Sequence, residues 1–304
     1  MEGVGIIIVT YNSEAEIGRC LEAAVATGAD VIVVDNASED RTRQEVERRG
    51  VRLIANPSNF GFATAVNQGV RALSAPLLLL LNPDAIIQTS LEPLRRACLD
   101  SQTAAAGGML LDERGEPQAG FMVRRFPTPA ALCYEALGVN RVWPRNPVNW
   151  HYRCLELDYR NALEVEQPAG AFLMIRRDAW EKLRGFDESF YPLWFEDVDF
   201  LKRARDSKYR ILFVPESVAK HTGGHSIQKI SLEFRQFYWY GNLLKYAAKH
   251  FSRGAGKLVC LAVIFGSLLR TVLGLPRQGS LKPIVVYGKV VRLAGRQLFL
   301  GSAG

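Results

Sequence analysis

The sequence has few cysteines and no acidic residue after Glu233. Its five cysteines are scattered, odd in number and without a C-x-x-C pair: Cys20, Cys98, Cys133, Cys154 and Cys260. This pattern excludes a disulfide framework and a structural zinc site, and it favours a reducing compartment. The start, Met1-Glu2-Gly3, lacks the basic segment of a secretory signal peptide, so none is expected.

The charge is unevenly distributed along the 304 residues. All 31 acidic residues lie within residues 1–233 together with 27 of the 38 Lys and Arg, so this part has a net charge of −4. The last 71 residues contain the other 11 basic residues. Because these alternate with long aliphatic runs, we expect the tail to bind an anionic membrane surface and not a nucleic acid.

The tail from Ser231 has a helical, amphipathic pattern of aromatic and basic residues. Its apolar run Leu258–Leu269 is only a dozen residues long and stops at Arg270, whereas a spanning helix needs about 20. We therefore expect an interfacial helix and no spanning one. A hairpin that covers the core, or a homodimer interface, is the alternative. The expected domains are residues 1–228 and 229–304.

The first hundred residues alternate short apolar runs with helical patterns. The runs are 5–9, 31–34, 51–54 and 77–81, and the helical segments between them are 13–25, 41–49 and 62–73. Ser13 and Glu16 form a capping-box signal at the first helix. Strands that alternate with helices imply an α/β fold with a doubly wound, mostly parallel sheet.

Polar residues follow three of these strands, namely Thr10, Tyr11 and Asn12, then Asp35 and Asn36, and finally Asn82 and Asp84. The carboxyl ends of parallel strands meet at one edge of a sheet, where α/β proteins bind their ligands. Neither the glycine fingerprint of a dinucleotide site nor the loop G-x-x-x-x-G-K-[ST] follows the first strand. The polar groups therefore predict a binding site of another kind.

The second half of the chain is less regular. A helix is expected at 90–101, but residues 112–165 contain five prolines and few long runs, and no element is assigned there. Residues 167–176 predict a strand that is entered through Gly170, which either lets a ligand approach the backbone or relieves packing. Further patterns predict a helix at 178–183, a strand at 211–214 and a glycine-rich loop at 221–226.

Three carboxylates follow an aromatic pair: Trp194 and Phe195 precede Glu196, Asp197 and Asp199. Acids at the start of a helix are stabilised by its free N–H groups, so a capped surface helix is one interpretation. A base in a partly dry cleft is the other. Asp199 lies four residues before Arg203, which favours an ion pair along the helix. The two aromatic side chains either stack on a sugar or pack in the core.

Six motifs, taken in order, resemble the inverting family 2 glycosyltransferases, and the nearest branch is the rhamnosyltransferase-like group. They are Val9-Thr-Tyr-Asn12, Val34-Asp-Asn-Ala-Ser38, Asn59-Phe-Gly-Phe-Ala63, Leu81-Asn-Pro-Asp84, Gly185-Phe-Asp-Glu188 and Phe195-Glu-Asp-Val-Asp199. The match spans residues 4–226. The resemblance implies the GT-A fold, a single nucleotide-sugar-binding α/β domain, and sugar transfer with inversion and without a covalent enzyme intermediate.

The resemblance also assigns roles to single residues. The nucleoside pocket and its surroundings would be formed by Thr10, Tyr11, Asp35, Asn59, Gly61 and Asn67. In that pocket Asp35 would accept a hydrogen bond from a pyrimidine base, and Gly61 would allow close approach of the backbone. Asp197 would be the general base that takes the proton of the acceptor hydroxyl. Glu196 is the second candidate, or it orients the acceptor.

A divalent cation is implied as well. Asn82-Pro-Asp84 stands in the place of the family's D-x-D metal motif, with an amide in place of the first acid. Asp84 and, in a glycine-rich loop, His221 would then be the ligands of Mg²⁺ or Mn²⁺, with His225 a weaker alternative. Such a cation offsets the charge of the departing diphosphate.

The Q-x-x-R-W motif of processive relatives is missing, because Arg235-Gln-Phe-Tyr-Trp239 does not match it. Transfer of one sugar per binding event is therefore expected. The resemblance implies a dTDP-rhamnose donor and a polyprenyl-diphosphate-linked or cell-surface glycan acceptor, at the cytoplasmic face of the cell membrane. A UDP-hexose donor is the alternative within the same fold. A catalytically silent nucleotide-sugar-binding protein is another, although it has no need for Asp84, Asp197 and His221 together.

Overall fold

The computed structural model describes residues 1–223, 231–278 and 281–300. By its internal packing the chain divides into two units. One comprises Met1–Phe126, Arg153–Pro192 and Glu196–Lys229, and the other comprises Pro127–Tyr152, Leu193–Phe195 and Ile230–Gly304. The domain boundary expected at residue 228 and the weaker metal candidate His225 lie outside the described residues.

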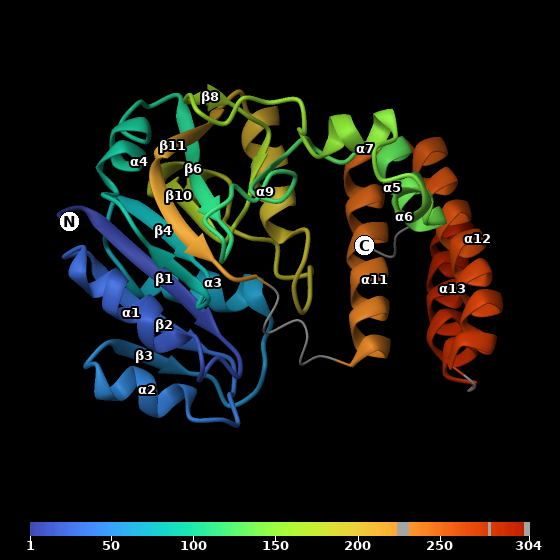
Figure 1. Cartoon of the computed structure of the whole chain (residues 1–304), viewed down its shortest axis with the longest axis horizontal. Helices are drawn as coiled ribbons and strands as arrows, with labels where there is room; N and C mark the ends of the chain where they lie inside the picture. Colours follow the sequence, from blue (N-terminus) through green and yellow to red (C-terminus); the bar gives the residue numbers. More distant parts are fainter. Residues whose placement is uncertain (224–230, 279–280, 301–304) are drawn as a thin grey trace. The chain divides into compact units, whose positions relative to one another are not determined.

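All strands of the described residues belong to the first unit. They are β1 (Val4–Thr10), β2 (Asp30–Asp35), β3 (Arg52–Ala55), β4 (Leu77–Leu81), β5 (Ala85–Ile87), β6 (Thr103–Leu111), β7 (Val123–Arg124), β8 (Leu163–Glu164), β9 (Gln167–Pro168), β10 (Phe172–Arg176) and β11 (Arg210–His221). Nine of them form one sheet with the order β3-β2-β1-β4-β10-β6-β11-β5 and β8 beside β11 (Figure 1). β3, β2, β1 and β4 are parallel, which confirms the doubly wound pattern.

The helices of this unit are α1 (Ile17–Ala26), α2 (Thr42–Arg48), α3 (Phe62–Ala72), α4 (Glu92–Ala97), α8 (Arg177–Lys182) and α9 (Glu196–Asp206). α1 buries Ile17, Cys20, Leu21 and Ala24, the apolar face that its helical spacing predicts. The predicted capping box is wrong. The Ser13 hydroxyl donates to the Tyr11 carbonyl at 3.5 Å, and among the described residues no side chain caps the helix.

The second half differs most from the expectation. β6 lies before the unassigned region and reads Thr-Ala-Ala-Ala-Gly-Gly-Met-Leu-Leu, with few of the β-branched residues that mark a strand. Its glycines are needed for packing, because a Cβ on Gly107 would lie 2.3 Å from Pro168 and one on Gly108 would lie 2.3 Å from the Phe172 ring. The strand expected at 167–176 is divided into β9 and β10, and β11 has 12 residues.

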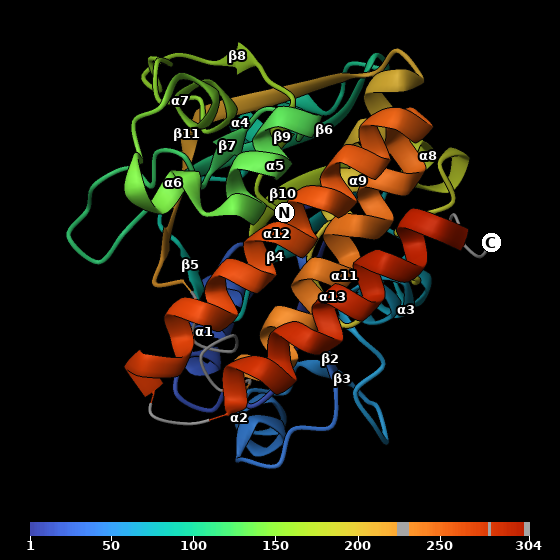
Figure 2. The same ribbon diagram turned by 90° about the vertical axis from the view of Figure 1, so that its right-hand side faces the viewer.

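The second unit is helical. Its helices are α5 (Pro129–Leu137), α6 (Val139–Val142), α7 (Pro147–Tyr152), α11 (Leu232–His250), α12 (Arg253–Gln278) and α13 (Lys282–Leu300). α12 and α13 lie side by side (Figure 2). The amide of Gln297 donates to the Leu244 carbonyl at 2.7 Å, which ties α13 to α11. The helices therefore form one bundle.

The expectation of no helix of spanning length was wrong. α12 continues through Arg270, whose guanidinium donates to the carbonyl oxygens of Glu135 and Ala136 at the end of α5. The Arg270 side chain therefore caps the end of α5, and α12 does not stop at this residue. By length and composition the 23 residues Arg253–Leu275 are able to cross a membrane. Their most apolar 18-residue window has a mean hydropathy of 2.2, and 33% of that window is buried.

Candidate active site

The candidate site lies at the carboxyl edge of the sheet. β10 is antiparallel to both β4 and β6, and β11 is parallel to β6, so β1, β2, β4 and β11 all end at this edge. Thr10 and Asp35 end β1 and β2, Asn82 follows β4, and His221 ends β11. The polar ends of separate strands thus converge as expected for an α/β sheet.

Asp35 is fully buried and surrounded by hydrogen-bond donors. Its carboxylate accepts from the Thr10 hydroxyl at 3.0 Å, the Ser38 amide at 3.0 Å, the Ser38 hydroxyl and Arg43 Nε at 2.7 Å. The half-buried Asn12 continues this network, since its backbone N–H donates to the Ser38 hydroxyl at 2.8 Å. A base that bonded to Asp35 would have to replace one of these donors.

The Asn59–Gly61 loop is joined to the same network. The Asn36 side chain donates to the Gly61 carbonyl at 3.1 Å, and the Gly61 amide donates to Asn59 Oδ1 at 2.9 Å. Gly61 has a φ of +87°, and a Cβ there would lie 2.9 Å from the Tyr191 ring. The backbone angle and packing within the protein therefore explain why residue 61 is a glycine.

Asn67 belongs to another group of contacts. Its side-chain amide donates to the Phe186 carbonyl at 3.0 Å and to Glu188 at 2.8 Å, while its oxygen accepts from the Phe186 amide at 3.1 Å. It thus fixes the Gly185–Glu188 turn against α3. Tyr11, by contrast, lies half-exposed beside Thr10 at the end of β1.

Asn82, Asp84 and His221 meet at the ends of β4 and β11. His221 Nε2 lies 3.4 Å from Asp84 Oδ1 and 3.4 Å from Asn82 Nδ2. The Gly223 amide donates to Asp84 Oδ2 at 3.1 Å. Burial opposes the ionisation of Asp84, but the contacts with His221 and the amide of Gly223 outweigh it and lower the pKa of Asp84 below its usual value.

The segment from Gln118 to Arg124 contributes three contacts that we did not predict. Gln118 bonds to His221 through both ends of its amide, and the Phe121 ring stacks on the imidazole at 5.3 Å and 13°. Arg124 lies 5.8 Å from the Phe121 ring centre, and its charge favours ionised Asp197. The turn residues Asp112 and Gly115 were the available signal, because they predict a hairpin that returns over the preceding strand.

Asp197 is the second residue of α9 and faces Gly170. Its Oδ2 accepts from the Gly170 amide at 3.2 Å, and its Oδ1 accepts from the Val198 amide at 2.8 Å. A Cβ on residue 170 would lie 3.0 Å from Asp197 Oδ2, so the glycine makes room for this carboxylate. Burial raises the pKa of Asp197, although these amides and the charge of Arg124 oppose the shift.

Glu196 is 5% exposed, and its Oε2 has no hydrogen-bond partner among the described residues. Burial, and secondly the charge of Asp197, raises the pKa of Glu196 well above its usual value. The two neighbouring acids therefore differ, because only Asp197 is held by two amides and is not fully buried. Asp199 pairs with Arg203 at 2.8 Å, as its spacing predicted.

Trp194 and Phe195 have unusual backbone angles, with φ of +79° and +75°. Two such non-glycine residues in a row are strained, which is typical of functional segments. Phe195 packs against Tyr246 at 5.4 Å, and the Asn242 side chain donates to the Leu193 carbonyl at 2.8 Å. α11 therefore holds this short segment within the second unit.

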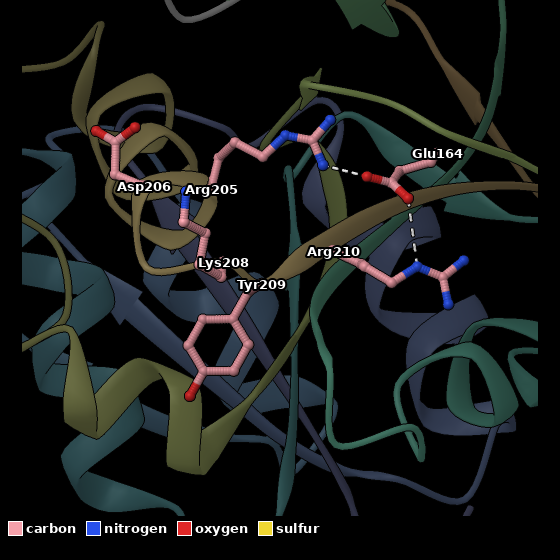
Figure 3. A pocket seen from close by; sticks show the side chains of 6 residues that line it. All are labelled: Glu164, Arg205, Asp206, Lys208, Tyr209 and Arg210. Atoms are coloured by element: carbon pink, nitrogen blue, oxygen red, sulfur yellow. Dashed lines mark hydrogen bonds and ion pairs between the residues drawn. The ribbon is translucent and has the colours of Figure 1, made fainter.

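A surface hollow of about 480 Å³ lies elsewhere, at the amino end of β11 (Figure 3). In it Glu164 pairs with Arg205, and Arg210 Nε lies 3.3 Å from a Glu164 oxygen. Arg210 begins β11 whereas His221 ends it, so the hollow is at the opposite edge of the sheet. Its lining has two acidic and three basic residues, and because it lies away from the polar strand ends we assign it no catalytic role.

Comparisons with known proteins agree with this geometry. The sequence pattern of glycosyl transferase family 2 matches residues 5–184, more than half of the chain, and that of the "N-terminal domain of galactosyltransferase" matches residues 151–225. The chain belongs to glycosyl transferase family 2. It is a glycosyltransferase with the GT-A fold, as the motifs predicted.

Two of the similar proteins are named rhamnosyltransferases. The N-acetylglucosaminyl-diphospho-decaprenol L-rhamnosyltransferase of Mycobacterium tuberculosis (strain H37Rv) is 28% identical over 73% of this chain and 76% of its own length. The Escherichia coli (strain K12) rhamnosyltransferase WbbL is 24% identical over 73% and 84%. The mannosyltransferase PcManGT of Pyrobaculum calidifontis, solved with GDP-Man and Mn²⁺, has a TM-score of 0.56 at 16% identity, over 98% of this chain and 88% of its own.

Proposed function

We propose that this glycosyltransferase moves a single L-rhamnose from dTDP-rhamnose to a polyprenyl-diphosphate-linked glycan, with inversion at the anomeric carbon. The names of the two rhamnosyltransferase relatives support the sugar, and the decaprenol-linked substrate in one name supports the acceptor class. The observation that carries the reaction type is the carboxylate of Asp197, held by the Gly170 and Val198 amides at the edge where the strands end.

Asp197 is the proposed general base. Each carboxylate oxygen accepts one amide hydrogen bond and keeps a second lone pair, which is available for a proton. The acceptor oxygen bonds to the anomeric carbon while its proton passes to Asp197. The bond from that carbon to the diphosphate oxygen breaks, and its electron pair leaves with the diphosphate. Burial raises the pKa of Asp197 and so makes it a stronger base.

Asp84 and His221 are the proposed ligands of a divalent cation. Among the described residues no group of three or more His, Cys, Asp or Glu side chains is placed to hold a metal. The pair nevertheless fits, because a carboxylate oxygen and an imidazole nitrogen 3.4 Å apart repel each other unless a cation or a proton lies between them. Bound Mg²⁺ or Mn²⁺ would offset the charge of the departing diphosphate.

A panel of nucleotide sugars tests the proposal. Release of dTDP and transfer to a polyprenyl-diphosphate-linked acceptor are measured with and without EDTA. We expect turnover with dTDP-rhamnose that EDTA abolishes and added Mn²⁺ restores. Turnover with UDP-hexoses alone would show that the donor is a UDP-hexose and would leave the enzyme class unchanged. Tight nucleotide binding without any turnover would instead support the silent binding protein.

We also propose that the enzyme lies on the cytoplasmic face of the cell membrane, held by α12 and α13. One side of α12 is apolar and 40% to 66% exposed, and it consists of Leu258, Leu261, Phe265, Leu268, Leu269, Val272 and Leu273. α13 exposes basic residues at Lys282, Lys289, Arg292 and Arg296, of which Lys289 pairs with Glu233 at 2.5 Å. Neither α12 nor α13 contains an acidic residue. Such apolar and basic helices suit an anionic bilayer better than a second copy of this basic unit.

Flotation with vesicles tests the membrane proposal. The full chain should float with phosphatidylglycerol vesicles and much less with phosphatidylcholine vesicles. Changing Phe265 and Val272 to Glu should lower binding at least about tenfold, because two apolar side chains would no longer be buried. Val25→Glu, at a residue 49% exposed on α1, is the matched control. Undiminished flotation, or conversion of a dimer to a monomer by the same changes, would contradict the proposal. Carbonate extraction distinguishes a spanning α12 from a surface helix.

A further inference from the structure

The environment of His221 suggests a role for a residue outside every motif of the family resemblance. Gln118 follows the hairpin after β6, where its backbone amide donates to the Leu110 carbonyl at 2.9 Å. Its side-chain Nε2 donates to the backbone carbonyl of His221 at 2.7 Å, and its Oε1 lies 3.0 Å from His221 Nδ1. One amide thus binds both the backbone and the ring of the same histidine.

These two contacts determine where the imidazole carries its proton. A backbone carbonyl only accepts hydrogen bonds, so the NH₂ end of Gln118 must face it. The oxygen of Gln118 therefore faces Nδ1, and because that oxygen also only accepts, Nδ1 must carry the hydrogen. The neutral imidazole then has its free lone pair on Nε2, the nitrogen 3.4 Å from Asp84.

The other neighbours of the ring agree with this assignment. Asn82 Nδ2, which only donates, faces Nε2 at 3.4 Å and so matches a lone pair there. Phe121 stacks on the ring at 5.3 Å and limits its rotation. A protonated imidazole paired with Asp84 would also keep its hydrogen on Nδ1. The role of Gln118 is therefore the same in both protonation states.

We propose that Gln118 is a positioning residue that holds His221 with Nδ1 protonated and Nε2 directed at Asp84, ready to bind a divalent cation. A ligating histidine commonly donates its second ring nitrogen to such an acceptor, which fixes the tautomer and the ring orientation. The part of the inference that concerns the cation rests on the proposed function. The part that concerns the tautomer does not.

The test measures the tautomer first, without metal or donor. ¹⁵N-histidine spectra of the whole protein are recorded at about pH 8.5, where an ordinary imidazole is neutral, and a His221→Asn variant assigns the signal. We expect the Nδ1–H form of His221 in the wild type and a mixture of tautomers in Gln118→Leu. Gln118→Glu keeps an acceptor for Nδ1–H and should restore the single form. Gln88→Leu is the matched control, because the Gln88 side-chain amide bonds to the Ile86 carbonyl on β5.

Titration with Mn²⁺ follows on the same proteins. Gln118→Leu should bind Mn²⁺ about 10–100-fold more weakly than the wild type, and Gln118→Glu should recover most of the affinity. An Nε2–H tautomer in the wild type, or an unchanged tautomer in folded Gln118→Leu, would overturn the role of Gln118. If the wild type binds no Mn²⁺ but the tautomer responds as expected, the cation proposal fails and Gln118 keeps its positioning role.

Discussion

Two buried acidic regions of the first unit are built in opposite ways. Asp35, at the end of β2, accepts hydrogen bonds from four donors on Thr10, Ser38 and Arg43. At the start of α9, Glu196 has one oxygen with no partner among the described residues, and Asp197 accepts from two amides only. Donors around a carboxylate stabilise its charge, whereas burial with few donors opposes it.

This difference separates structural from chemical tasks. A carboxylate that is saturated with donors holds its neighbours in place. A carboxylate with few donors and a raised pKa costs stability, and it gains basicity near neutral pH. We therefore propose that Asp35 orders the residues of the expected nucleoside pocket and that Asp197 takes the proton.

The largest expected effect is the loss of transfer in Asp197→Asn. An amide of the same shape cannot take a proton, so kcat should fall about 10²–10⁴-fold, while the donor dissociation constant stays within a few fold. Asp206→Asn is the control, because Asp206 lies exposed on the same helix and pairs with Lys202. Wild-type kcat in Asp197→Asn would remove Asp197 from the mechanism.

Asp35→Asn should have the largest effect on stability. The change leaves N–H groups of Ser38 and Arg43 facing an amide that carries its own N–H groups, so the free energy of unfolding should fall by about 3 kcal/mol. In Asp30→Asn, at the start of the same strand, only an exposed pair with Arg52 at 3.4 Å is lost. That control should lose less than about 1 kcal/mol in urea unfolding. Equal losses would refute the structural role of Asp35.

Gly170→Ala should disturb the base without unfolding the protein. The added Cβ would lie 3.0 Å from Asp197 Oδ2, so the carboxylate must shift. Misplacement of a catalytic group by about 1 Å costs on the order of 100-fold, and we expect kcat to fall about 10–100-fold. Gly288→Ala on α13, where a Cβ meets no atom within 4 Å, is the control. A normal kcat in Gly170→Ala would show that this contact does not position Asp197.

The smallest expected effect is a change in how the free energy of unfolding depends on pH. The folded-state pKa of Glu196 is raised, so the folded protein binds more protons than the unfolded chain above the ordinary carboxyl range. Its contribution to stability therefore falls as pH rises through that window, and Glu196→Gln should remove this slope in urea unfolding. The contribution of Glu92 to the pH dependence has the opposite sign, because its bonds with Arg95 and Arg96 lower its pKa to about 2. An unchanged slope in Glu196→Gln would count against its raised pKa.

The sequence predicted the parts of the fold and site that follow local patterns. Apolar runs ending in Thr10, Asp35 and Asn82 indicated parallel strands and the edge where they meet. Gln118 was not predictable in the same way, because its role depends on a hairpin that brings it to His221, 103 residues later. The length of α12 was missed because the helical cap that Arg270 provides for α5 is a tertiary contact.

The stereochemistry of transfer tests the account most directly. If Asp197 acts as a base in a single displacement, the anomeric carbon must end with the configuration opposite to that in the donor. Proton NMR of the product formed from dTDP-rhamnose, recorded before any secondary reaction, reports this configuration. The account predicts complete inversion, and a product with the donor's configuration would contradict it.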